Sequence, residues 1–181
     1  MTPTTRLDEL TGDYVIDIAH TRIGFVARHT MATRVRGQFD EFGGTVHLDG
    51  GHPSRSGVRL AIRAQSIQTG SKQRDDLLRG KFLDVENHPD ITFSSVGVAR
   101  TDDTHFTVTG DLTLRGVTQP VSAGVELLVG TTGPRGDFRV GFRGGVTVDR
   151  GDWGVNWNAV TRALISPEVT LEFDITALRN P

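Results

Sequence analysis

Hydrophobic and polar residues alternate along most of this chain, in short stretches separated by glycine-rich turns. The clearest stretch is 58–65, where Val58, Leu60 and Ile62 share one face and charged or small polar residues occupy the other. A two-residue period is typical of a half-buried β-strand. The same period recurs at residues 14–18, 23–28, 35–48, 91–98, 106–114, 121–129, 138–148 and 169–175. The pattern predicts an all-β fold, a lipocalin-like antiparallel β-barrel of about eight strands.

Two features of this pattern indicate how such a barrel would bend. The alternation breaks at residues 20–22 and then resumes, which predicts a corner or bulge there. Gly37, Gly43 and Gly44 lie inside the long alternating segment 35–48. Glycines inside a strand mark sharp bends, and a barrel needs such bends to close.

A different pattern occupies residues 71–80 and predicts one short helical insertion. Ser71 is a suitable N-cap, and Leu77, Leu78 and Phe82 fall on one helical face. Gly80 suits the left-handed residue that ends a helix, and Pro89 prevents continuation into the next strand. A lone amphipathic helix in an all-β chain is expected to cover the mouth of the barrel.

Length and composition fit one domain without strong attraction to charged polymers. The 181 residues predict a flexible N-terminal lead-in over 1–12 and a single barrel domain over 13–181. The net charge of −2 predicts no strong electrostatic attraction to nucleic acid or anionic membrane, and we expect no nucleic-acid partner and no stable membrane insertion. No cysteine is present for disulfides or metal thiolates. The N-terminus lacks the apolar region of a secretory signal, and no stretch is long enough to span a membrane. We therefore expect a cytoplasmic protein.

The chain offers few side chains for catalysis or metal binding. His20 and His29 flank one predicted strand, nine positions apart, or roughly 30 Å if the segment is fully extended. Asp75 and Asp76 are adjacent and point in different directions on a helix. Nucleophile-elbow and phosphate-loop spacings are missing from the sequence. We expect no metal, no cofactor and no catalytic residue, and keep a His-dependent small-molecule enzyme as an alternative.

Several motifs, taken in order, resemble the YceI-like family. They are Tyr14-x-Ile16-Asp17-x-x-His20-Thr21-x-Ile23-Gly24-Phe25-x-Ala27-x-His29, Gly37-x-Phe39-x-x-Phe42-x-Gly44, Ser66-Ile67-x-Thr69, Arg74-Asp75-x-x-Leu78, Phe82-x-Asp84, Pro89-x-Ile91-x-Phe93-x-Ser95, Gly110-Asp111-Leu112-Thr113-Leu114-x-Gly116-Val117-Thr118-x-Pro120-Val121, Gly141-Phe142 and Arg150-x-Asp152-Trp153-Gly154. The resemblance covers nearly the whole chain. It implies a lipocalin-like barrel with a helix packed over it, which binds a long isoprenoid or related lipid inside and is often a dimer.

These considerations predict a non-catalytic carrier or store for a long apolar isoprenoid-like lipid, of polyprenyl or prenyl-quinone type. Aromatic residues predicted to form the wall are Phe25, Phe39, Phe42, Phe93, Phe142 and Trp153. His29 and Arg74 are predicted contacts at a polar end, and Trp157 lies close to Trp153 in sequence. We also expect a homodimer, and this expectation rests on the resemblance alone. A barrel packed solid with side chains, acting as an interaction or stress-response module, is the other alternative.

Overall fold

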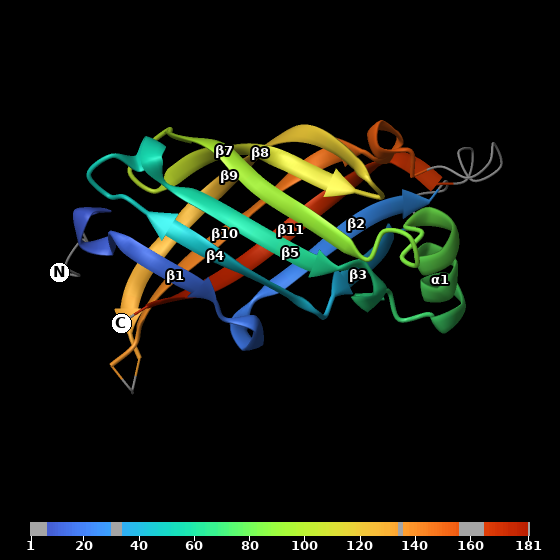
Figure 1. The fold of residues 1–181 in the computed structure, drawn as a ribbon, viewed down its shortest axis with the longest axis horizontal. Helices are drawn as coiled ribbons and strands as arrows, with labels where there is room; N and C mark the ends of the chain where they lie inside the picture. Colours follow the sequence, from blue (N-terminus) through green and yellow to red (C-terminus); the bar gives the residue numbers. More distant parts are fainter. Residues whose placement is uncertain (1–6, 30–33, 134–135, 156–164, 181) are drawn as a thin grey trace.

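The computed structural model describes residues 7–29, 34–133, 136–155 and 165–180. Eleven strands form one sheet that curls into a barrel (Figure 1). The strands are β1 Gly12–Ile16, β2 Arg22–His29, β3 Arg34–Phe39, β4 Phe42–Leu48, β5 Gly57–Arg63, β6 Ile67–Gln68, β7 Asp90–Arg100, β8 His105–Leu114, β9 Val117–Thr132, β10 Phe138–Asp149 and β11 Ile165–Arg179. The helical elements are η1 Leu7–Leu10, η2 Ile18–His20, η3 Pro53–Arg55, η4 Ala64–Ser66, α1 Lys72–Leu77, η5 Leu78–Phe82 and η6 Arg150–Trp153.

Eight of these strands close the barrel, which confirms the predicted fold class. The antiparallel order β1-β4-β5-β7-β8-β9-β10-β11 returns to β1 through the β1–β11 pairing. The remaining strands, β2, β3 and β6, lengthen the wall of the barrel at one end. β2 continues β1 along β11, β3 pairs with β2 and leads into β4, and β6 follows β5 to pair with β3. The barrel is therefore longer on the side built by β2, β3 and β6.

The break predicted at residues 20–22 marks the change from β1 to β2. The 3-10 turn η2 occupies Ile18–His20 between the two strands. Thr21 Oγ1 donates to Thr176 O at 3.3 Å and accepts from Thr176 N–H at 3.1 Å. These bonds hold the corner against β11, so both β1 and β2 pair with β11 although the chain turns between them.

Alternating residues of β5 show why the sequence forms a barrel wall. Leu60 and Ile62 face the interior, while Arg59 and Arg63 are exposed. A strand places successive side chains on opposite faces, so its aliphatic residues enter the barrel together. The burial of those side chains contributes the main stabilisation of the wall.

The helical insertion lies where the sequence predicts it and ends later than expected. Ser71 Oγ accepts a hydrogen bond from Arg74 N–H at 3.3 Å and so caps α1. The chain then continues through a π-helical turn, η5, to Phe82. Gly80 was expected to end the helix in a left-handed conformation, but it lies inside η5 and has no positive φ. Burial of Phe82, which is 4% exposed, favours continuation of the helical segment two residues beyond Gly80.

The end of the barrel formed by β1 and β4 is closed by residues that were expected to be a loose lead-in. Leu10 of η1 is 3% exposed and belongs to the hydrophobic core. The Tyr14 hydroxyl donates to Leu10 O at 2.7 Å, and burial raises the pKa of this phenol. Two leucines and this hydrogen bond fix residues 7–10 against the barrel. None of the helices in the described ranges is long and apolar enough to cross a membrane.

Candidate functional site

A large cavity occupies the interior of the barrel. Its volume is about 990 Å³, and aliphatic and aromatic side chains from nearly every strand line it. This volume is at the upper end of the range of about 300–1,000 Å³ that is common for small-molecule pockets. An apolar interior of this kind excludes polar ligands that cannot keep their hydrogen bonds and favours long hydrocarbon chains.

Most of the aromatic residues expected in the wall line this cavity. They are Phe25, Phe39, Phe93, Phe142 and Trp153. The rings of Phe25 and Phe39 lie 5.9 Å apart between centroids, and Trp153 is 2% exposed. Trp153 Nε1 donates to Leu112 O at 2.9 Å, which fixes the indole at the junction of η6 and β8. Their direct contact with a ligand stays a prediction.

Glycines on neighbouring strands allow two of these rings to lie along the wall. A Cβ atom on Gly37 would come within 2.3 Å of Phe25 Cζ, and one on Gly110 within 2.5 Å of Phe93 Cζ. Both distances are far shorter than a carbon–carbon contact allows. Each ring therefore covers a glycine of the adjacent strand, which leaves the centre of the barrel open.

Three of the residues singled out in the sequence are not found among the described side chains that line the cavity. Phe42 packs in the hydrophobic core at 8% exposure and is not among the cavity-lining residues. It is the first residue of β4, beside the kink that separates this strand from β3. His29 ends β2, but its side chain lies outside the described part of the structure, as does Trp157.

Arg74 lines the cavity and is also part of the network that holds the helix. Its Nε donates to Thr69 Oγ1 and its Nη2 to Thr69 O, both at 2.7 Å. Asp75, which is 7% exposed, accepts from Thr69 N–H at 2.9 Å and from Thr69 Oγ1 at 2.5 Å. The guanidinium thus positions α1 on the loop before it, and a headgroup contact by Arg74 stays a prediction.

Sequence reasoning missed much of the aliphatic wall. Val108, Leu112, Leu171 and Phe173 line the cavity from β8 and β11. Their strands were predicted from the alternation, and the inward face of each strand could have been selected from the same pattern. Choosing residues by aromatic character alone left these positions out.

His20, His47, His52 and His105 are exposed, and each forms an ion-pair contact with a carboxylate. His20 Nδ1 is 2.7 Å from Asp17 Oδ2 on η2, outside the cavity lining. Within the described ranges, no cluster of three or more histidine, aspartate or glutamate side chains could hold a metal ion.

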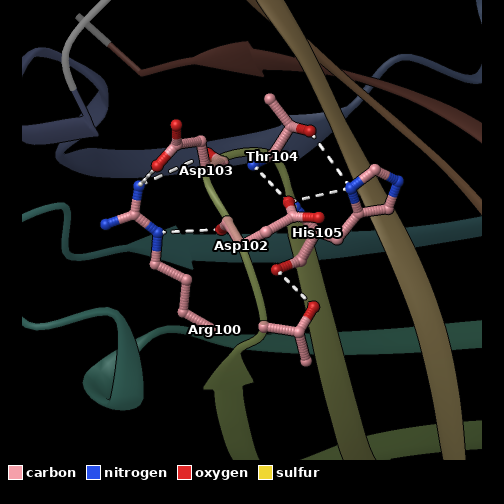
Figure 2. Close-up of polar contacts among 6 residues, drawn as sticks. Arg100, Asp102, Asp103, Thr104 and His105 are labelled. Carbon is pink, nitrogen blue, oxygen red and sulfur yellow. Dashed lines mark hydrogen bonds and ion pairs between the residues drawn. The ribbon is translucent and has the colours of Figure 1, made fainter.

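A further polar cluster forms the turn between β7 and β8. Figure 2 shows the Asp102 carboxylate accepting from Thr104 N–H at 2.9 Å and from His105 N–H at 2.8 Å. The Thr104 bond, followed by the bond to the His105 side chain, holds the pKa of Asp102 below its usual range. This cluster is at the opposite end of β7 from α1 and supports the turn.

Comparison with known proteins places the chain in a family. The YceI-like domain matches residues 14–177. The chain belongs to the YceI-like family. Among its curated relatives, a UPF0312 protein of Azotobacter vinelandii is 34% identical over 149 residues, covering 81% of this chain and 78% of the relative. A UPF0312 protein of Pseudomonas aeruginosa is 34% identical over 174 residues, covering 94% and 89% respectively.

Solved structures have the same YceI-like barrel. Burkholderia cenocepacia BcnA superposes with a TM-score of 0.80 at 22% identity, covering 89% of this chain and 98% of BcnA. A polyisoprenoid binding domain from Saccharophagus degradans superposes with a TM-score of 0.72 at 17% identity, covering 92% and 98%. At these identities the likeness establishes the fold.

Proposed function

We propose that this YceI-like protein binds a long apolar isoprenoid-like lipid inside its barrel and performs no chemistry on it. The observation that carries the proposal is the cavity of about 990 Å³ lined mainly by hydrocarbon side chains. The structural neighbour named as a polyisoprenoid binding domain supports the same ligand class. An open interior of this size does not fit the alternative of a barrel packed solid with side chains.

The cavity volume sets an approximate capacity for the chain. At roughly 30 Å³ for a water-sized group, a volume of 990 Å³ holds about 33 such groups. A methylene or methyl group is comparable in size, so the limit is near 30 carbon atoms. Isoprenoids of several units fit completely, whereas much longer ones extend beyond the barrel.

Burial of such a chain provides enough free energy for tight binding. Each buried methylene contributes about 0.8 kcal/mol, so about 20 of them contribute roughly 16 kcal/mol. The association and ordering costs are about 4–15 kcal/mol. A chain of this length therefore binds without many polar contacts, and the few polar groups near α1 are enough to orient one end.

Native mass spectrometry of the purified protein, followed by organic extraction, tests the proposal. We expect a stoichiometric apolar adduct, or a stoichiometric complex after incubation with geranylgeraniol. Palmitate provides a comparison ligand with a straight chain and a charged end. A protein that is purified without an adduct and does not bind farnesol, geranylgeraniol or solanesol would refute isoprenoid binding.

A further inference from the structure

The cavity reaches the surface mainly beside the helical insertion. Five of the exposed residues that line it are within 73–81, namely Gln73, Asp76, Leu77, Gly80 and Lys81. In the described part of the chain, the other exposed lining residues are His47 and Thr92. We call the surface formed by residues 72–81, which includes this rim, the mouth of the cavity.

The barrel wall lacks a strand ladder next to this mouth. β6 pairs with β3, and β7 pairs with β5 and β8, but the described residues form no pairing between β6 and β7. The chain between these two strands forms α1 and η5, and α1 lies at that end of the barrel (Figure 1).

Side-chain hydrogen bonds and the burial of Phe82, instead of a ladder, hold the insertion in place. Arg79 Nε donates to Gln65 O at 2.8 Å, and its Nη2 donates to Ile67 O at 3.0 Å. Within the ranges that the structure describes, opening this segment breaks no strand pairing between β6 and β7. The mouth is therefore the place where a ligand could cross the wall without disrupting the sheet.

The opposite end of the barrel is closed by residues 7–10. In addition to the bond between Tyr14 and Leu10, Arg179 Nη1 donates to Glu9 O at 3.1 Å and Gly50 N–H donates to Thr11 Oγ1 at 3.0 Å. Leu10 is buried at 3% exposure beneath these bonds. This end contains the buried core that residues 7–10 complete, so opening it would expose that core.

The mouth carries positive charge on a chain that is acidic overall. The chain has two lysines, Lys72 and Lys81, and both are exposed on the insertion. Leu77 lies between them and is 38% exposed. Of the two acidic residues there, Asp75 is buried and Asp76 lies 3.3 Å from Arg79. Residues 72–82 contain four basic and two acidic residues, a net charge of +2, although the net charge of the chain is −2.

We propose that the mouth docks on an anionic lipid bilayer, with Lys72 and Lys81 at the headgroups and Leu77 inserted among them. The identity of the cargo rests on the proposed function. A long isoprenoid is held in a bilayer by the same apolar burial that would hold it in the barrel. Direct transfer between the two avoids exposing the chain to water, so the mouth has to meet the lipid surface. Lysines beside an exposed apolar residue provide that contact.

Amine acetylation measures the docking directly, because the chain contains only two lysines. The protein is labelled with acetic anhydride in the presence of phosphatidylcholine vesicles, with or without phosphatidylserine, and the labelled peptides are measured by mass spectrometry. We expect Lys72 and Lys81 to be acetylated several-fold more slowly with the anionic vesicles. High salt should abolish this protection, because it screens surface charges beyond about 10 Å at 0.1 M and more strongly above that. Equal labelling of both lysines with the two vesicle types would overturn the proposal.

Paired charge reversals test the same surface. In Lys72→Glu/Lys81→Glu, binding to phosphatidylserine vesicles should weaken by at least about 25-fold, since each lysine near such a surface contributes roughly fivefold. Arg55→Glu/Arg59→Glu is the matched control, because it changes the net charge equally at exposed residues of η3 and β5. An equal loss in the control would show a net-charge effect and overturn docking through the mouth.

Geranylgeraniol binding in detergent separates this inference from the proposed function. Bound isoprenoid together with unprotected lysines would refute membrane docking and leave the proposed function standing. Protected lysines without isoprenoid binding would establish docking and refute the proposed cargo. Circular dichroism of each variant verifies that the barrel is folded in either case.

Discussion

Filling the cavity from one wall position should shorten the longest ligand that the barrel accepts. Val108 on β8 lines the cavity, and the register pairs it with Ala123 of β9. Val108→Trp adds about seven non-hydrogen atoms, and because bonded ring atoms occupy less than half of the roughly 30 Å³ of a free water, the added volume is on the order of 100 Å³. This is about a tenth of the 990 Å³ cavity. The variant should therefore lose space for about three carbons, or less than one isoprene unit.

The predicted energetic effect depends on the length of the ligand. A chain that fills the wild-type cavity loses up to about 2–3 kcal/mol of burial at about 0.8 kcal/mol per methylene, whereas a short chain such as farnesol loses little. The assay is native mass spectrometry with an equimolar mixture of farnesol, geranylgeraniol and solanesol. We expect the complexes of Val108→Trp to shift away from solanesol, which is longer than the cavity, toward farnesol and geranylgeraniol, which still fit.

The matched control for this experiment is Thr107→Trp. Thr107 is adjacent to Val108 on β8 and is absent from the cavity lining, so its side chain points to the other face of the strand. This control should retain the wild-type preference. If both variants lost affinity equally for all three alcohols, the cavity of this structure would not be the binding site.

Two further predictions concern the wall and the β7–β8 turn. Gly37→Ala places a methyl group against the Phe25 ring and should lower the free energy of unfolding by about 1–3 kcal/mol in urea titrations. Gly43→Ala, where a Cβ atom meets nothing within 4 Å, is its control and should change stability by less. Because the pKa of Asp102 is lower in the folded state, its carboxylate stabilises the fold above its unfolded pKa of about 4, and this contribution is lost as pH falls through the folded value. Asp102→Asn should therefore flatten the acid limb of stability against pH, and urea midpoints that still fall as steeply in acid would contradict this assignment.

The sequence alone determined the class of the fold and the character of its interior. The alternation of residues 58–63 specifies which side chains enter the barrel, because the period of a strand is two. Ser71 and the apolar face of 72–82 likewise predict the helix, because capping and amphipathic spacing are local properties. Local sequence signals did not determine where the helix ends, because burial of Phe82 in the tertiary structure continues it beyond Gly80.

Only the tertiary structure decided which inward-facing residues surround open space. Phe42 and Phe39 are both apolar residues of neighbouring segments, yet Phe42 is in the packed core and Phe39 lines the cavity. Their difference depends on the kink between β3 and β4 and on the residues that the closed ring brings opposite them. Likewise, Leu10 becomes part of the core because Tyr14 and Arg179, which is far away in sequence, hold residues 9 and 10 against the barrel. A pattern along the chain specifies the face of a residue, whereas the closure of the ring specifies what lies across from it.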